Sequence, residues 1–286
     1  MRYGLYLPNF GAFGDPKTLV SLAVDAEANG WDGFFIWDHI AGFDNTMVDP
    51  WVGLAAVAQA TERIRIGTTV TPVPRRRPQK LARETASIDR LSDGRLTFGV
   101  GIGEGAGEYD NLGEEASLIA RGEMLDEALE VITRLWSGET VDHRGTHYRV
   151  EGARFLPVPV QTPRIPIWVG GFWPHRKPMR RAAAWDGVIP LFSAGDEEVR
   201  LRELRQCIDY VRAHRRDDAP FDVVYMGITP GDNPERAREI VARYHSTGAT
   251  WWLESIAPYR FDEGFAEPWD LQALRERVLQ GPPRID

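Results

Sequence analysis

The chain has 286 residues, of which 43% are hydrophobic and 27% are charged, so it can bury the core of one closed α/β barrel and its composition excludes intrinsic disorder. Its 34 Lys and Arg residues against 42 Asp and Glu residues give a formal net charge of −8. This balance argues against a nucleic-acid-binding surface and against adhesion to an anionic membrane. We therefore expect an enzyme or a binding protein that acts in solution.

The first part of the chain alternates between short apolar runs and helical patterns. Two of the helical segments begin with an aspartate followed by proline, at Asp15-Pro16 and Asp49-Pro50, which is a typical helix start. A third helix is expected to begin at Pro78 and to end before Asp93-Gly94. The strand-like runs around these helices are Tyr3–Leu7, Gly33–Trp37, Arg65–Thr71 and Leu96–Gly101.

The second part repeats the alternation after one irregular stretch. Strand-like runs occur at Ile167–Val169, Val188–Leu191, Val223–Ile228 and Trp251–Ser255. Helical patterns occur at Pro178–Ala184, Glu197–His214, Pro234–His245 and Trp269–Gln280. Eight strands that alternate with helices imply parallel pairing through right-handed crossovers. The fold class that we predict is a single (β/α)8 TIM barrel that covers residues 1–286, with Ser137–Pro166 as a short insertion that contains a hairpin between strands four and five.

The single cysteine, Cys207, excludes an intramolecular disulfide, and the absence of a Cys/His cluster argues against a structural zinc site. His143 and His147 are four residues apart, but the Arg144-Gly145 turn between them predicts a hairpin, so we expect no metal there. No apolar run reaches the length of a membrane span, and the Met1–Leu7 segment leads straight into a strand. We expect a cytoplasmic protein.

In a barrel of this kind the site is built where the strands end. His39 follows strand two beside Asp38 and is the candidate for acid–base work, because imidazole titrates near neutral pH; a solvated loop histidine is the alternative. Glu104 follows Gly101 and Gly103, which allow a close approach of the backbone to a ligand, although an exposed loop carboxylate would fit the same pattern.

Two further segments could bind an anion. Gly170-Gly171 follows strand five and could let backbone N–H groups converge on a phosphate. The Arg75-Arg76-Arg77 triplet could bind a phosphate or an acidic tail, or could simply be solvated at the start of a helix.

Several segments, taken together, resemble the bacterial luciferase-like family of barrel oxidoreductases, which use reduced FMN or the 5-deazaflavin coenzyme F-420. The resemblance covers roughly residues 1–192 and rests on many motifs in one order. They include Gly33–His39, Gly67-Thr68-Thr69-Val70-Thr71-Pro72, Leu91–Leu96, Gly99–Gly103, Leu135–Gly138 and Trp168–Gly171.

The resemblance implies a role for each matching residue. His39 would be the base or substrate-orienting group and Glu104 an acid, as in deazaflavin-linked dehydrogenases. The cofactor would be contacted by Asp38, Thr69, Val70, Thr71, Gly101, Gly103, Gly170, Gly171 and Phe172. A non-proline cis peptide between Thr69 and Val70 is implied as well, and so is a homodimer.

The resemblance favours hydride transfer between the deazaflavin coenzyme F-420 and a small organic substrate. A monooxygenase that uses reduced FMN is the alternative within the family, and a non-catalytic flavin-binding barrel is a second. An aldolase or isomerase barrel would need a lysine at a strand end, whereas Lys17, Lys80 and Lys177 fall in predicted helices or loops.

Overall fold

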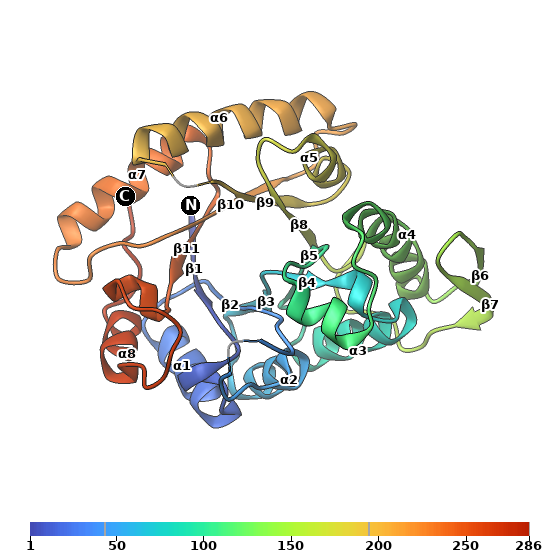
Figure 1. Ribbon diagram of the computed structural model, residues 1–286, viewed down its shortest axis with the longest axis horizontal. Helices are drawn as coiled ribbons and strands as arrows, with labels where there is room; N and C mark the ends of the chain where they lie inside the picture. The colour runs from blue at the N-terminus through green and yellow to red at the C-terminus, as the bar shows by residue number, and fades with distance from the viewer. Residues whose placement is uncertain (43, 194, 286) are drawn as a thin grey trace.

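The computed structural model describes residues 1–42, 44–193 and 195–285, and the expected end of the domain at Asp286 lies outside them. Eight parallel strands form a closed ring in the order β3, β2, β1, β11, β10, β9, β8, β5, and direct pairing between β3 and β5 closes the ring. Helices surround the ring of strands (Figure 1). The predicted (β/α)8 TIM barrel is confirmed.

The barrel strands follow the predicted apolar runs closely, because residues buried on both faces of a parallel sheet are apolar throughout. Their bounds are β1 Arg2–Leu7, β2 Gly33–Ile36, β3 Arg65–Thr68, β4 Thr71–Pro72, β5 Leu96–Gly101, β8 Ile167–Phe172, β9 Gly187–Leu191, β10 Asp222–Gly227 and β11 Trp251–Ser255. The pattern alone predicts an unbroken third strand over Arg65–Thr71. Instead, β3 and β4 flank Thr69 and Val70, whose peptide bond is cis, as the resemblance implies.

The helices pack outside the strands. They are α1 Pro16–Ala28, α2 Pro50–Ala60, α3 Pro78–Leu91, α4 Leu118–Trp136, α5 Arg176–Ala182, α6 Glu197–His214, α7 Pro234–Thr247 and α8 Leu271–Leu279. Asp15 and Asp49 cap α1 and α2 through their carboxylates, as the sequence predicts. Helix α5 begins two residues before the predicted Pro178, because a proline in the first turn lacks only an N–H that would have no helical partner.

Large side chains fill the interior of the barrel. Phe35, Trp168 and Trp251 pack against one another in tilted and edge-on arrangements with ring centroids 5.1 to 5.6 Å apart, and Ile189, Val224 and Leu253 complete this buried cluster. A second, larger cluster lies between the strands and the helices. The barrel is therefore a packed core, and chemistry is confined to its ends. In the described part of the chain no helix is long and apolar enough to cross a membrane.

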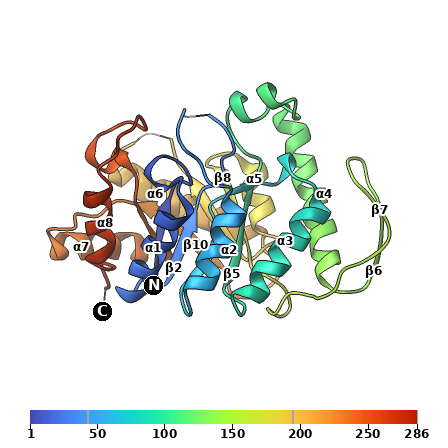
Figure 2. The same ribbon diagram turned by 90° about the horizontal axis from the view of Figure 1, so that it is seen from below.

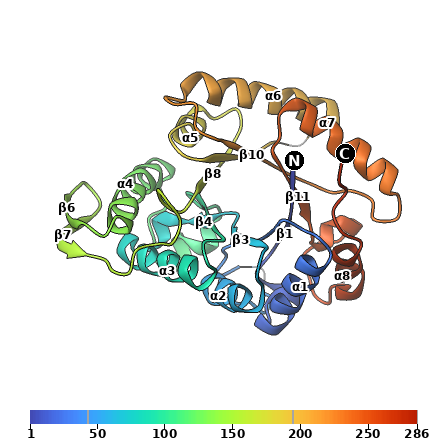
Figure 3. The ribbon, with the colours of Figure 1, turned by 180° about the vertical axis from the view of Figure 1, so that it is seen from behind.

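The loops after β2, β5 and β11 rise together at one end, opposite the end where the N-terminus lies (Figure 2). This is the carboxyl end of the parallel strands. The predicted hairpin forms from β6 Thr140–Arg144 and β7 Arg149–Arg154 and lies outside α4, at the edge of the molecule (Figure 3). The insertion thus stays away from the mouth of the barrel.

One carboxylate fastens this hairpin to α4. The two oxygens of Glu127 accept hydrogen bonds from the backbone N–H groups of Thr146, His147 and Tyr148, at 2.7 to 3.0 Å, and one of them lies 3.0 Å from Nε2 of His143. A two-stranded hairpin is marginally stable by itself, so this contact determines how well its turn is held.

We expect the Glu127→Gln substitution to loosen the turn, because an amide offers one acceptor oxygen where the carboxylate offers two. Leaving one of the partly buried N–H groups of His147 and Tyr148 without an acceptor costs about 1–3 kcal/mol. Hydrogen exchange of the amides of Thr146–Tyr148 should therefore accelerate roughly tenfold or more. Glu62→Gln, which changes an exposed carboxylate far from the hairpin, is the control. Equal exchange in E127Q and the parent protein would contradict this role of Glu127.

Candidate active site at the carboxyl end of the barrel

Asn9 fixes the backbone at the end of β2. It follows β1 and is fully buried. Its Nδ2 group donates to the carbonyl oxygens of His39 and Val48, both at 2.8 Å, and its Oδ1 atom accepts from the N–H of His39 at 3.1 Å. Both N–H groups and the oxygen of the Asn9 side-chain amide are thus hydrogen-bonded. Asn9 therefore determines where the backbone of His39 lies.

The imidazole of His39 is held by a carboxylate from a different loop. Its Nδ1 atom lies 3.1 Å from Oε2 of Glu108, in the segment after β5. A carboxylate only accepts hydrogen bonds, so the proton of a neutral imidazole is on Nδ1 and the lone pair is on Nε2. Oε1 of Glu108 also accepts from the N–H groups of Ile40 and Ala41, at 2.7 and 3.3 Å. Glu108 thus ties the loop after β2 to the segment after β5.

Buried arginines complete this arrangement. Nη1 of Arg75 lies 3.0 Å from Oε2 of Glu108, and its Nη2 group donates to Oδ1 of Asp38 at 2.9 Å. Arg76 donates to the same Oδ1 atom at 2.7 Å, and Thr71 donates to Oδ2 at 2.7 Å. Two guanidinium groups face two carboxylates, so the charges of this ion cluster cancel. We call Asp38, Arg75, Arg76 and Glu108 the mouth ion cluster.

Glu108 keeps its charge in this setting. Burial favours the protonated carboxyl group, but the hydrogen bonds from His39 and from the N–H of Ile40, together with the charge of Arg75, outweigh burial and hold the pKa of Glu108 below its ordinary value. An ionised Glu108 accepts the Nδ1–H bond of His39 and so orients the ring with Nε2 free of this contact. The imidazole is therefore placed to accept a proton.

Aromatic rings surround His39. The ring centroids of Phe10 and Trp37 lie 5.8 and 5.6 Å from that of the imidazole, and Phe265, from the loop after β11, lies 5.4 Å from Phe10 and 5.7 Å from Trp37. Among the described residues, the indole Nε1 atom of the partly exposed Trp37 and the Oγ1 atom of Thr69 are buried without a hydrogen-bond partner. Buried polar atoms are normally paired, so a ligand that reached these two atoms would supply the missing partners.

The structure places the predicted site residues in different surroundings. Glu104 is exposed between two glycines with positive φ angles, Gly103 and Gly105, and within the described residues its side chain makes no hydrogen bond or ion pair. The carboxylate of Asp38 is fully enclosed by the mouth ion cluster and Thr71, so a direct contact with a ligand would need those bonds to open. The carboxylate that contacts His39 is thus Glu108.

The predicted glycines pack closely against neighbours. A Cβ atom at Gly101 or Gly170 would lie 2.6 or 2.9 Å from the side chain of Val70, and one at Gly171 would lie 2.4 Å from Pro178 of α5. Phe172, the last residue of β8, is 39% exposed. Val70 therefore reaches between β5 and β8, and these glycines provide the space for it and for α5.

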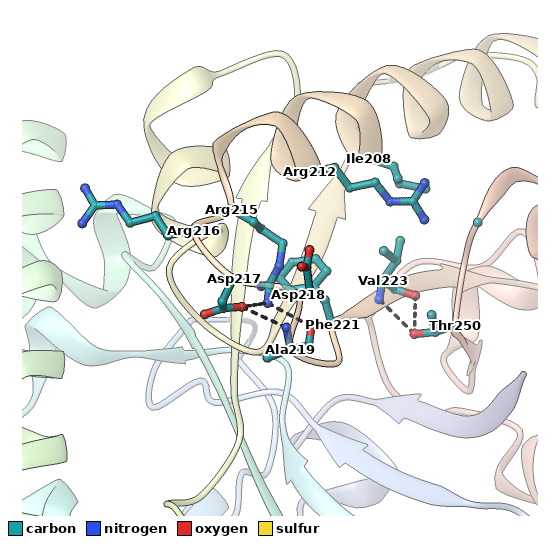
Figure 4. A pocket seen from close by; sticks show the side chains of 11 residues that line it. Ile208, Arg212, Arg215, Arg216, Asp217, Asp218, Ala219, Phe221, Val223 and Thr250 are labelled. Atoms are coloured by element: carbon teal, nitrogen blue, oxygen red, sulfur yellow. Dashed lines mark hydrogen bonds and ion pairs between the residues drawn. The ribbon is translucent and has the colours of Figure 1, made fainter.

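A separate pocket of about 600 Å³ lies at the opposite, amino-terminal end of the barrel, beside the end of α6 (Figure 4). The guanidinium group of Arg215 in this pocket donates to Asp217 and to the carbonyl oxygens of Trp185 and Ala219. Its hydrogen bonds are therefore already used within the protein. The active-site candidates lie at the other end. In the described ranges no group of three or more His, Cys, Asp or Glu side chains could hold a metal ion.

Residues 1–277 match the family model for luciferase-like monooxygenases. The chain belongs to this family. Among the relatives of this luciferase-like protein is the F420-dependent glucose-6-phosphate dehydrogenase of Microbacterium testaceum, 35% identical over 73% of this chain and 62% of that protein. The matched part is thus less than two thirds of the length of that dehydrogenase.

Another relative is the oxygenase component of the flavin-dependent trigonelline monooxygenase of Acinetobacter baylyi, 28% identical over 92% of this chain and 76% of that protein. In three dimensions the luciferase-like chain is similar to a monooxygenase from Streptomyces bottropensis, with a TM-score of 0.78 at 21% identity over 98% of both chains. The structural likeness supports the fold, and the two named relatives use different cofactor chemistry.

The sequence reading of this luciferase-like chain missed Glu108, because it stands in an acidic stretch that reads as solvated loop. One signal was present. The Arg75-Arg76 pair follows the third predicted strand, and the acidic segment follows the fourth, so both lie at the same mouth of the predicted barrel. An arginine that is buried there needs a carboxylate as its partner. Which carboxylate meets them is a matter of loop geometry.

We expect Glu108→Gln to lower the free energy of unfolding of the luciferase-like chain by about 1–3 kcal/mol at pH 7, because Arg75 loses one of its two charged partners. The pKa of Glu108 is lower in the folded than in the unfolded chain, so its contribution is complete above the ordinary glutamate pKa, about 4.3, and is lost as the pH falls through the lower folded value. Chemical denaturation across this pH range measures the difference. Exposed Glu104→Gln is the matched control, and equal stability of E108Q and E104Q at pH 7 would contradict the assignment.

Proposed function

We propose that this luciferase-like protein is an oxidoreductase that transfers a hydride between a dissociable deazaflavin, the coenzyme F-420, and a small organic substrate. The observation that carries the proposal is the His39–Glu108 pair at the carboxyl end of the barrel, with a charged carboxylate behind the imidazole. The name of the Microbacterium relative supports a deazaflavin as the cofactor.

The residues present fit such a cofactor. A flavin-type ring system carries carbonyl and N–H groups along one edge, and these match the unpartnered Nε1 of Trp37 and Oγ1 of Thr69. Val70 would support the ring from behind, together with Thr71, Gly101 and Gly103 around it. The bound deazaflavin supplies the position that accepts or donates the hydride.

The protein's own part is to move a proton and to orient the substrate. Nε2 of His39 would take the proton of a substrate hydroxyl group, or return one to a carbonyl oxygen, while Glu108 holds Nδ1–H and stabilises the imidazolium that forms. Asn9 keeps the backbone of His39 in place. The aromatic rings around the imidazole exclude water from this step.

Gly170, Gly171 and Phe172 at the end of β8 would take the phosphate side of the cofactor, with Asp38 acting from behind through Arg75 and Arg76. Glu104 would serve as a second proton carrier if its loop folds over the bound substrate, since both flanking glycines permit unusual backbone angles. These assignments rest on the resemblance and on position at the mouth.

The second candidate function is a monooxygenase that uses reduced FMN, and the named Acinetobacter relative favours it. A flavin-binding barrel without activity would share the fold and bind the cofactor without turnover. We further propose that the whole chain acts as one cytoplasmic domain and as a homodimer. The lone cysteine, Cys207, is buried and unpaired, which suits a reducing compartment.

The choice of cofactor is tested by titrating the purified protein with each candidate and following fluorescence. We expect the deazaflavin to bind at least tenfold more tightly than FMN, a difference of about 1.4 kcal/mol. Equal or reversed affinities would move the assignment to the monooxygenase.

We expect His39→Ala to leave the dissociation constant of the deazaflavin within a few fold and to lower the catalytic rate by roughly 10²–10⁴, the usual contribution of a positioned acid or base. His214→Ala, which changes an exposed histidine at the far end of α6, is the control. Near-normal turnover of H39A at saturating cofactor would remove His39 from the mechanism.

A further inference from the structure

A second hollow, of about 660 Å³, lies at the amino-terminal end of the barrel, near both chain termini (Figure 2). Four arginines line it: Arg2 at the start of β1, Arg65 at the start of β3, Arg63 just before it, and Arg284 near the end of the chain. We call this feature the arginine hollow. The chain has a formal net charge of −8, so an acidic protein gathers positive charge here, away from the candidate active site.

Two carboxylates also line the arginine hollow, and both are hydrogen-bonded within the protein. Glu27 accepts from three consecutive backbone N–H groups, at 2.6 to 3.2 Å, and Arg63 approaches it only to 3.9 Å. Asp32 accepts from the N–H of Tyr3 at 2.8 Å and pairs with Arg284 at 3.1 Å. The oxygens of both carboxylates are therefore engaged by the backbone and by two of the four arginines.

Arg65 is held in place with part of its guanidinium group unused. Its Nε group donates to Oγ1 of Thr97 at 3.1 Å, and its Nη2 group donates to the carbonyl oxygen of Leu96 and to Oε1 of Gln161, at 3.3 and 3.2 Å. These acceptors are neutral, and Nη1 makes no hydrogen bond with the residues that the structure describes. The guanidinium group is thus fixed without a carboxylate partner, and Nη1 remains a donor for a ligand.

Arg2 is the second arginine without a counterion. Its guanidinium carbon lies 5.5 Å from the ring centroid of the buried Trp251, and within the described ranges its side chain makes no hydrogen bond or ion pair. Burial, and after it the charge of Arg2, lowers the pKa of Arg65. The two positive charges thus oppose each other, and an anion bound to both would offset this repulsion.

Two more distant carboxylates reduce the positive charge only in part. Asp222 and Asp89 raise the pKa of Arg65, but the effect of each is smaller than that of Arg2. The oxygens of Asp222 accept from an indole N–H and a hydroxyl group, and those of Asp89 accept from two backbone N–H groups and a side-chain amide. Neither carboxylate forms an ion pair with Arg65 in the described part of the chain, so its charge has no direct partner.

We propose that the arginine hollow is a second ligand site of this protein and that it binds a phosphate group through Arg2 and Arg65. A phosphate group offers several acceptor oxygens, and guanidinium groups present paired N–H donors that match them. Because Arg65 is already fixed by three hydrogen bonds, little side-chain freedom is lost there on binding. The site lies at the opposite end of the barrel from His39 and does not depend on the proposed oxidoreductase function.

Calorimetric titration with inorganic phosphate tests the site, in a chloride buffer of constant ionic strength. The mouth of the barrel is first saturated with deazaflavin or FMN, whichever binds, so that it does not take up phosphate. We expect one equivalent of phosphate to bind. Glycerol 3-phosphate, titrated in the same way, distinguishes the source of the phosphate group: tighter binding of the ester indicates a phosphorylated small molecule, and tighter binding of the free ion indicates inorganic phosphate. Binding of neither overturns the proposal.

Variants connect the affinity to the two arginines. Arg65→Met and Arg2→Gln should each weaken phosphate binding about tenfold or more, because each removes one charged donor. Arg2 is exposed, so its replacement puts folding at little risk. Arg216→Gln changes an exposed arginine of the neighbouring pocket beside the end of α6 and is the matched control. Unchanged affinity in R2Q, or an equal loss in R216Q, overturns the assignment.

Thermal unfolding provides an independent measurement on the same proteins. A ligand that binds only the folded chain raises Tm, and phosphate also stabilises proteins without binding because it is excluded from their surface. The second effect is shared by all variants. Phosphate should therefore raise the Tm of the parent protein and of R216Q by more than that of R2Q. An equal rise in all three proteins would show that phosphate acts without this site.

Discussion

The site depends on one buried interaction, the pairing of Arg75 with both Asp38 and Glu108. Asp38 comes from the end of β2, Arg75 from the segment after β4, and Glu108 from the segment after β5. Each side chain is at most 7% exposed, so each would be very costly to bury alone. Their mutual neutralisation is the condition under which three loops can meet in one place, and the imidazole of His39 is held at that meeting point.

Such a cluster adds little net stability, because desolvation offsets most of the Coulomb attraction. The contribution of the cluster is to fix the relative positions of the three loops. Removing one member would leave an unpaired buried charge, so alternative arrangements of the same loops are penalised. The bond between Nδ1 of His39 and Glu108 gives the imidazole a defined orientation, which is what a proton-transferring group needs.

A second buried carboxylate makes the contrast clear. Glu254 on β11 is fully buried and accepts hydrogen bonds from the N–H and hydroxyl groups of Thr229 and from the indole of Trp252, and it pairs with Arg260. All of these partners are part of the folded barrel, and within the described part of the chain no imidazole contacts Glu254. Glu254 fastens the last strand to the segments around it, whereas Glu108 makes the same kind of contact and also touches a titratable group at the mouth.

The sequence by itself determined the barrel and the position of His39. Apolar runs of strand length, Asp-Pro helix starts and turn signals are local features, and the closure of eight parallel strands follows from them. That closure brings the strand ends together, so His39 could be assigned to the mouth without coordinates. The hairpin insertion was equally local, since Arg144-Gly145 interrupts two strand-like runs.

Only the tertiary structure decided which carboxylate faces His39. Glu104 and Glu108 are four residues apart in one irregular acidic segment, and no periodicity in a loop indicates which side chain turns inward. The choice depends on Arg75, more than thirty residues earlier, and on the N–H groups of Ile40 and Ala41, which offer a partner to a buried carboxylate. Likewise, only the structure shows that Gly101 and Gly170 make room for the side chain of Val70. Which residues of neighbouring strands pack closely depends on the arrangement of the strands in space, and the sequence does not indicate it.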